Sequence, residues 1–424
     1  MPIFYTCKRC KKNYSKNQYD ERVFCRICCS LLLSQFVIDP EIKEGLNESL
    51  FFKKKSIKKN LSFNSTENHF LKRAAHNLNN KVKNRKEYSV FSQKKVQKKP
   101  NVKGKESYLF NCEYEDALNL KKKLLKKFEK KPLEQAIPGK ITSNIHGEYY
   151  SIESICKSNF KKINYKKCEK NLISDLKLLQ GIGPKREFHL KKNGFATIKD
   201  LKRHPIWKKS ATNFINLLEK KQIGTLQSYL WQSLPKSHPH IHYLAGLCNI
   251  EDFAIVDIET LGLSERPIIL MGLAQIRKNG IHTKQFLLRD IPDEPSAIWA
   301  FVSSLQKECS LISYNGRSFD IPYVQQRLAY YGMDDSINYP HFDLLHFARR
   351  ALKSKINNCR LETVEAYLDI GRGINVPGAL VPDFYQTYLT TGNVGPLVAI
   401  VEHNKQDLVT LATLFSRLYE EWKI

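Results

Sequence analysis

One short apolar segment, residues 253–259 (FAIVDIE), constrains this chain most because it also carries two carboxylates. Its length and its branched side chains predict a buried β-strand. Side chains alternate between the faces of a strand, so Asp257 and Glu259 share one face while Val256 and Ile258 share the other. Two carboxylates on a buried strand are costly unless something neutralises them, and a bound divalent cation does so. The segment therefore predicts a metal site at the edge of a sheet.

Two later segments carry the acids that would complete such a site. Asp320 follows a second predicted strand, residues 311–315, and opens a helix. His403 and Asp407 are four residues apart in the last predicted helix, so they lie on one helical face. Such a set is the equipment for two Mg²⁺ or Mn²⁺ ions about 4 Å apart. We therefore expect one centre that contains Asp257, Glu259, Asp320, Asp407 and His403.

The hydrophobic pattern predicts a compact α/β domain from about residue 250 onward. Further strands are expected at 268–276 and 284–288, and helices at about 295–308, 319–331, 343–353, 361–368 and 396–421. Before this domain, 171–235 is typical of short helices and 141–155 of a hairpin around Gly147. Residues 114–130 could form a basic helix.

Charge divides the chain in a way that matches this organisation. The net charge is +27, of which residues 1–140 carry +19, residues 141–250 carry +12 and residues 251–424 carry −4. A basic part joined to an acid-bearing part fits a polyanion-binding region attached to a domain that performs chemistry. The alternative is that the Lys- and Asn-rich stretches are a solvated, disordered linker shaped by composition alone.

The first 35 residues contain two cysteine pairs, Cys7-x-x-Cys10 and Cys25-x-x-Cys28. Two such pairs complete a tetrahedral Zn²⁺ site, and zinc would supply the folding energy of a head too small for its own core. Cys29 could replace Cys28 as a ligand, and free cysteines in a small helical head are the alternative. The head resembles zinc ribbons. No apolar run reaches membrane-spanning length and the start lacks a secretory pattern, so we expect a cytoplasmic protein without membrane contact.

Gly181-Ile182-Gly183-Pro184 lies between two predicted short helices. The glycines permit a tight turn, and Pro184 suits the first turn of the following helix. That helix would offer free N–H groups to a phosphate, with Lys185 and Arg186 beside them. The stretch resembles a helix-hairpin-helix element, which grips nucleic-acid backbones, and it favours DNA. A helical connector that uses its glycines for packing is the alternative.

The chain resembles the four-carboxylate (DEDD) 3′–5′ exonuclease superfamily of the ribonuclease H-like fold. The resemblance rests on three motifs in this order: Asp-x-Glu, Asn-x-x-x-Phe-Asp and His-x-x-x-Asp. Within the superfamily, residues 240–424 look like the predicted bacterial RNase H-like exonucleases, a group that segments 341–345, 361–365 and 376–378 also resemble. The resemblance implies a mixed five-stranded sheet flanked by helices and metal-dependent removal of nucleotides from a 3′ end. It also implies that the metal ligands are Asp257, Glu259, Asp320 and Asp407.

The last motif departs from the superfamily. Its histidine branch has four residues between His and Asp, whereas three separate His403 from Asp407 here. His403 could be a general base, a group that orients water, a partner of a ligand, or a helix residue facing solvent or core. Asp343 is a candidate fifth acid, which we interpret rather as a structural acid or a partner of a ligand. Leu263 and Phe319 could stack on a terminal base or belong to the core, and Asn315 joins them as a candidate nucleic-acid contact.

These observations predict four parts: a zinc-ribbon-like head (1–35), a basic and mostly disordered linker (36–135), a hairpin and helix-hairpin-helix region (136–240), and the exonuclease domain (241–424). The expected function is Mg²⁺- or Mn²⁺-dependent 3′–5′ hydrolysis of DNA or RNA. Two alternatives remain, a nucleic-acid-binding adaptor with an inactive nuclease fold and an endonuclease of the ribonuclease H type.

Overall fold

The computed structural model describes residues 107–421, apart from 158–159, 162, 264, 334–336, 372 and 375, and four short strands before them: β1 (Phe4–Thr6), β2 (Asn13–Ser15), β3 (Leu33–Ser34) and β4 (Tyr88–Phe91). The chain divides into two units, residues 1–63 and 64–424. In the first unit β1 pairs antiparallel with both β2 and β3. The cysteines of the expected zinc site (Cys7, Cys10, Cys25, Cys28 and Cys29) lie outside the described residues, so that site stays a prediction.

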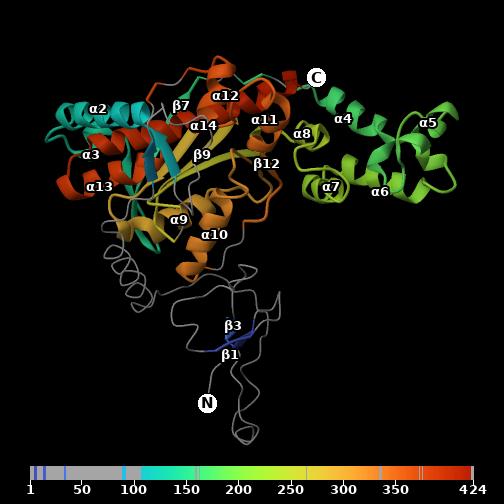
Figure 1. Cartoon of the computed structure of the whole chain (residues 1–424). Helices are drawn as coiled ribbons and strands as arrows, with labels where there is room; N and C mark the ends of the chain where they lie inside the picture. Colours follow the sequence, from blue (N-terminus) through green and yellow to red (C-terminus); the bar gives the residue numbers. More distant parts are fainter. Residues whose placement is uncertain are drawn as a thin grey trace, which may run out of the picture. The chain divides into compact units, whose positions relative to one another are not determined.

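The second unit is built on a mixed sheet of seven strands in the order β12-β11-β8-β9-β10-β7-β6 (Figure 1). Strand β8, third in this order, pairs parallel with β11 on one side and antiparallel with β9 on the other. The strands are β6 (Lys140–Asn144), β7 (Gly147–Cys156), β8 (Phe253–Thr260), β9 (Ile268–Arg277), β10 (Gly280–Leu287), β11 (Ser310–Ser313) and β12 (His341–Asp343).

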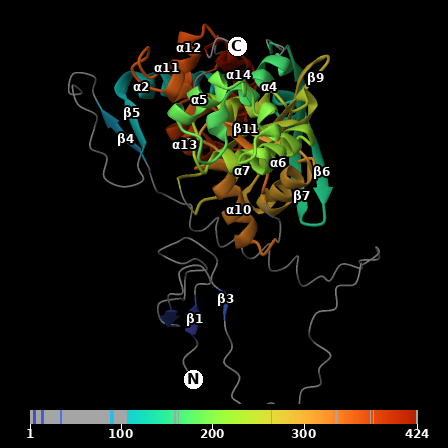
Figure 2. The same cartoon turned by 90° about the vertical axis from the view of Figure 1, so that its right-hand side faces the viewer.

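This sheet corrects the expected count of five strands. The hairpin at 141–155, which the sequence analysis grouped with the helical region, forms β6 and β7 (Figure 2). Strand β7 pairs antiparallel with β10. Without β7, strand β10 would present a row of unpaired N–H and C=O groups at an open edge. The hairpin is therefore part of the sheet.

Helices cover both faces of the sheet. Ala254, Val256 and Ile258 of β8 belong to a buried cluster that includes α9 (Glu294–Ser303) and α10 (Asp320–Tyr330). Phe253 and Ile255 belong to a second cluster, which includes α11 (Leu344–Leu352) and the later part of α14 (Gly395–Glu421). The predicted alternation along this strand is confirmed. Two further helices, α12 (Leu361–Tyr367) and α13 (Val381–Thr391), complete this part, and the sequence analysis missed α13 and β12.

The helical middle of the chain contacts the sheet at its β12 edge (Figure 1). It comprises α4 (Tyr165–Ser174), α5 (Pro184–Lys192), α6 (Lys208–Glu219), α7 (Ile223–Leu230) and α8 (Pro239–Ala245). The buried Gln227 of α7 accepts a hydrogen bond from the backbone N–H of His341 and donates one to its carbonyl, both at 3.1 Å. One amide thus satisfies edge groups of β12 that another strand would otherwise pair.

Ordered elements also fall within the range expected to be a mostly disordered linker. Strand β5 (Ser107–Phe110) pairs with β4, and α2 (Asn111–Lys127) and α3 (Leu133–Ala136) follow it. Helix α2 packs tightly on α14, since a Cβ atom at Gly395 would lie 2.5 Å from the carbonyl oxygen of Leu124. Lys121 also pairs with Asp383 of α13 at 2.6 Å. None of the described helices is both long enough and apolar enough to cross a membrane.

Candidate active site

The two carboxylates of β8 face α14, where an asparagine holds the first of them. Asn404 Nδ2 donates to Asp257 Oδ2 at 2.8 Å and to the Asp257 carbonyl at 3.2 Å. Its Oδ1 accepts from Gln285 Nε2 at 2.8 Å. This approach requires a glycine on the neighbouring strand, because Gly272 lies opposite Asp257 and a Cβ there would be 2.3 Å from Asn404 Oδ1. The amide thus fixes the orientation of Asp257.

Asp320 reaches the same strand from the start of α10. Its Oδ1 accepts a hydrogen bond from the backbone N–H of Ile258 at 3.0 Å, and its side chain is buried. The turn before it is tight, since a Cβ at Gly316 would lie 2.5 Å from Ser313 Oγ and 3.1 Å from Asp320 Oδ2. A glycine at this position therefore lets the third carboxylate approach β8.

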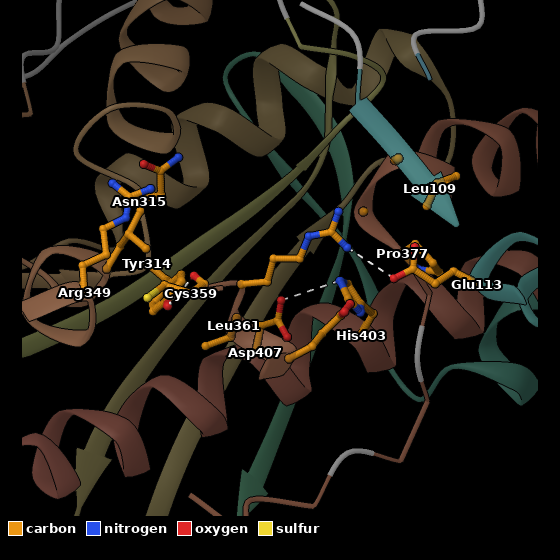
Figure 3. Close-up of a pocket in the computed structure, with 15 residues that line it drawn as sticks. Leu109, Glu113, Tyr314, Asn315, Arg349, Cys359, Leu361, Pro377, His403 and Asp407 are labelled. Carbon is orange, nitrogen blue, oxygen red and sulfur yellow. Dashed lines mark hydrogen bonds and ion pairs between the residues drawn. The ribbon is translucent and has the colours of Figure 1, made fainter. Parts of the chain in front are cut away.

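His403 and Asp407 lie one turn apart on α14, as their spacing predicts. His403 Nε2 is 3.6 Å from Asp407 Oδ2 (Figure 3). It is 3.8 Å from Glu259 Oε1. All three side chains are buried. The imidazole therefore lies between a carboxylate of β8 and a carboxylate of the last helix.

The electrostatics of the site reflect this crowding. Burial raises the pKa of Asp257 well above its ordinary value, and the negative charges of Asp407, Glu259 and Asp320 raise it further. Burial also raises the pKa of Asp320 to about 7, although the N–H of Ile258 lowers it. Buried acids that repel one another are an unfavourable arrangement in the absence of cations. Their oxygen donors are those that Mg²⁺ and Mn²⁺ prefer, so the donor set fits such ions.

The acid side chains are turned toward protein donors. Within the part of the chain that the structure describes, no three His, Cys, Asp or Glu side chains are arranged to hold one ion. Asp257 and Asp320 instead accept the hydrogen bonds from Asn404 and from the Ile258 backbone.

A cavity of about 320 Å³ adjoins the carboxylates and is lined in part by Leu263 and Phe319. A tyrosine that the sequence analysis missed organises its wall. The hydroxyl of Tyr323 accepts from the N–H of Arg266 at 3.0 Å and lies within hydrogen-bonding distance of the carbonyls of Gly262 and Arg266. Tyr323 follows Asp320 by three residues in α10, a spacing that places both on one helical side.

Asp343, by contrast, is occupied by the backbone. Its Oδ1 accepts from the N–H groups of Asn315 and Leu345, at 2.8 and 3.1 Å, and its Oδ2 accepts from that of Arg317 at 3.2 Å. Asn315 has a positive φ of 70° in this turn. These contacts are those of a structural acid that supports the turn leading to Asp320.

The predicted backbone-gripping residues form one turn between two short helices. Gly181 has a positive φ of 87°, and a Cβ there would lie 3.0 Å from the Trp207 ring. Gly183 precedes α5 without a side-chain cap, and Lys185 is exposed beside it. Arg186 Nη1 donates to the Gly181 carbonyl at 2.6 Å, so this guanidinium braces the turn. These residues line neither the 320 Å³ cavity nor the second cavity described below.

Sequence reasoning missed several residues that shape the site. Asn404 stands inside the last motif, next to His403, and this position was its only signal. Gln285 and Gly272 carry no local signal, because their roles come from the pairing of β8, β9 and β10.

Comparison with known proteins identifies the fold of this part of the chain. The family model described as RNase_H superfamily matches residues 254–419. The uncharacterized protein YprB of Bacillus subtilis (strain 168) is 33% identical over 173 residues, which are 39% of this chain and 42% of YprB. The chain thus matches less than half the length of this curated relative.

Among solved structures, the family B DNA polymerase of the hyperthermophilic archaeon Pyrobaculum calidifontis matches 39% of this chain and 24% of its own. The identity is 14% and the TM-score 0.31, too slight a likeness to carry an argument. The superfamily match and the mixed sheet together give residues 254–419 an RNase H-like fold. RNase H-like nucleases generally use divalent metal ions, and the match supports a nucleic-acid-cleaving function in general terms.

Proposed function

We propose that this protein is a divalent-metal-dependent 3′–5′ exonuclease. The observation that carries the proposal is the convergence of four carboxylates from β8, α10 and α14, with a histidine next to two of them, Glu259 and Asp407. Each acid alone could be a cap or a surface residue. Acids from three elements, of which Asp257 and Asp320 have raised pKa values, are an arrangement whose cost is offset when cations bind.

Asp257, Glu259, Asp320 and Asp407 are the residues that would hold two Mg²⁺ or Mn²⁺ ions. Such ions, when bound, activate water and stabilise the charge on the leaving oxygen. Asn404 keeps Asp257 in orientation through its hydrogen bond to Oδ2. His403 Nε2, between Glu259 and Asp407, is the atom we assign to accept the proton of the attacking water.

The 320 Å³ cavity supports attack at a strand end. It combines an aliphatic and an aromatic side chain, Leu263 and Phe319, with the carboxylates Asp257 and Glu259. A terminal base could stack on the apolar wall while its phosphate meets the acids. The turn at Gly181–Gly183, with exposed Lys185, would add contacts to the sugar–phosphate backbone.

The zinc-binding head remains a proposal from the cysteine spacing. Elemental analysis of the full chain is expected to find one zinc per chain, and Cys10→Ser to lose it. Metal-free protein with alkylatable head thiols would contradict the assignment.

The function is tested by incubating single-stranded DNA and RNA, labelled at the 5′ end, with the protein and Mg²⁺ or Mn²⁺. We expect a ladder that shortens from the 3′ end. A single internal cut would favour an endonuclease of the ribonuclease H type, and binding without cleavage would favour an adaptor. The RNA and DNA arms also identify the preferred nucleic acid.

A further inference from the structure

A second cavity, of about 550 Å³, lies beside the carboxylates. Its lining includes Asp407 and His403, which also line the 320 Å³ cavity, together with Arg349 and Arg360. Figure 3 shows Arg349 with Asn315 on one side of this cavity and Glu113 on the other, with Asp407 and His403 between them. The two cavities thus meet at the last helix of the candidate site.

The chemistry of the two cavities differs. Leu263 and Phe319 give the smaller one an apolar wall, which suits a base. The larger one is lined by two guanidinium groups and by the carboxylates of Glu113, Glu362 and Asp407. The guanidinium groups suit the oxygens of phosphates because they present several N–H donors in a planar fork. A strand with its terminal base in the first cavity and its scissile phosphate at the acids would continue into the second.

We propose that Arg349 and Arg360 bind the phosphates on the 5′ side of the scissile bond, and that Glu113 occupies this site in the free protein. The proposal rests on the proposed exonuclease function, because that function fixes the direction of the strand. It assigns a substrate subsite outside the four carboxylates and names the group that substrate must displace.

The contact of Glu113 is that expected of an internal substitute for a phosphate. Arg360 Nη1 is 3.2 Å from Glu113 Oε1, and Glu113 lies in the first turn of α2. Its other oxygen accepts from the Phe110 N–H at 2.9 Å, so the carboxylate is oriented by its own helix. The pairing of Lys121 with Asp383 fixes that helix on α13.

The pair can also be exchanged at low cost. The side chains of Arg360 and Glu113 are 35% and 25% exposed, so solvent reaches both partners. Ion pairs that solvent reaches contribute little to stability. A phosphodiester can therefore replace the carboxylate, and the guanidinium remains paired with a negative charge throughout.

The test uses a 5′-labelled strand whose second and third linkages from the 3′ end are neutral methylphosphonates, beside the unmodified strand. The terminal linkage is natural in both, so release of the last nucleotide reports the same cut. We expect the wild-type kcat/KM to fall about tenfold to a hundredfold on the modified strand, because charge-assisted hydrogen bonds are lost.

Arg360→Gln should lower kcat/KM on the unmodified strand by a similar factor. On the modified strand, this variant should have little further effect on kcat/KM. Arg350→Gln, a matched control on α11 that does not line the cavity, should keep the wild-type response. Glu113→Gln retains an acceptor for the Phe110 N–H, and should raise kcat/KM a few-fold on the unmodified strand only. If Arg360→Gln and Arg349→Gln both stay as sensitive to methylphosphonates as wild type, the subsite is wrong.

Binding separates this outcome from failure of the exonuclease proposal. Fluorescence anisotropy in EDTA compares the two strands without cleavage, and melting curves check that each variant is folded. The subsite is supported if the wild type binds the modified strand more weakly than the unmodified one, even if no nucleotide is released. This difference in affinity should be smaller in Arg360→Lys and absent in Arg360→Gln. Equal binding of both strands by the wild type overturns the subsite, whether or not the strands are digested.

Discussion

The helical middle of the chain and the sheet that it contacts handle charge in opposite ways. Residues 141–250, which hold β6, β7 and the helical middle, carry net +12, and lysines of the helical middle such as Lys185 and Lys192 are exposed to solvent. Residues 251–424 carry only −4, but several of their acids are buried. Exposed charge costs a fold little and can accumulate by composition alone. Buried acids oppose folding, so they point more strongly to a function.

The largest expected effect on activity comes from changes to the buried acids. Asp257→Asn and Asp407→Asn should each lower nuclease activity on the order of a hundredfold or more, because an oxygen donor of the metal site is lost. The fold should be kept, since the substitution removes repulsion. Asp252→Asn, just before β8, is the control that should digest like wild type. If either site variant kept the activity of the wild type, the substituted acid would not take part in catalysis.

The second-largest effect on activity is expected from a change in the strand pairing that orients Asp257. Gly272→Ala would place a Cβ 2.3 Å from Asn404 Oδ1, so Asn404 must move and its bond to Asp257 is lost. We expect a stability loss of about 1–3 kcal/mol in urea unfolding and a lower kcat. Gly224→Ala, whose Cβ would meet Pro340 at an ordinary 3.5 Å, is the matched control. Full activity in Gly272→Ala would show that the asparagine does not position the acid.

The buried acids also predict a pH dependence without metal. The pKa of Asp320 is raised from 3.8 to about 7, so the folded state holds a proton that the unfolded chain releases at lower pH. Stability in EDTA should therefore fall as pH rises from about 4 to about 7, by a few kcal/mol. Mn²⁺ should restore it. Asp320→Asn should flatten this slope, and an unchanged slope would mean that Asp320 ionises normally.

The smallest effect is expected on the exposed side. Lys185→Ala should reduce the salt dependence of nucleic-acid binding by roughly 0.7 to 0.9 in the log–log slope, which corresponds to one phosphate contact. Base preference should not change, because backbone contacts position rather than specify. Lys278→Ala, in the exposed turn between β9 and β10, is the control. Identical slopes for Lys185→Ala and wild type would support compositional drift.

The sequence was most informative where the pattern is local. The alternation at 253–259 predicted β8 and its two faces, and the helical spacing of His403 and Asp407 predicted their common side. The sequence pattern did not predict long-range strand pairing. Strand β10 pairs with a hairpin that lies more than a hundred residues earlier in the chain, as the pairing of Ser151 with Phe286 illustrates. A fragment that starts at residue 240 would therefore expose the edge of β10 and lose α2.

Residues defined by distant contacts were missed for the same reason. Glu113 and Arg360 meet only because α2 packs against α13 and α14, and no spacing in the sequence links them. Gly272 looks like an ordinary strand glycine until its register opposite Asp257 is known. The sequence shows which acids lie on buried segments and therefore oppose folding, whereas the fold shows which residues hold these acids in place.

The central claim is that the converged carboxylates remove nucleotides from a 3′ end with divalent metal. It is tested most directly by one strand carrying different labels at its two ends, digested by wild type and by Asp257→Asn in Mn²⁺. We predict that the wild type releases the 3′ label first as a mononucleotide while the 5′ label descends a ladder, and that the variant does neither. Internal fragments from the first time point, or equal digestion by the variant, would contradict the account.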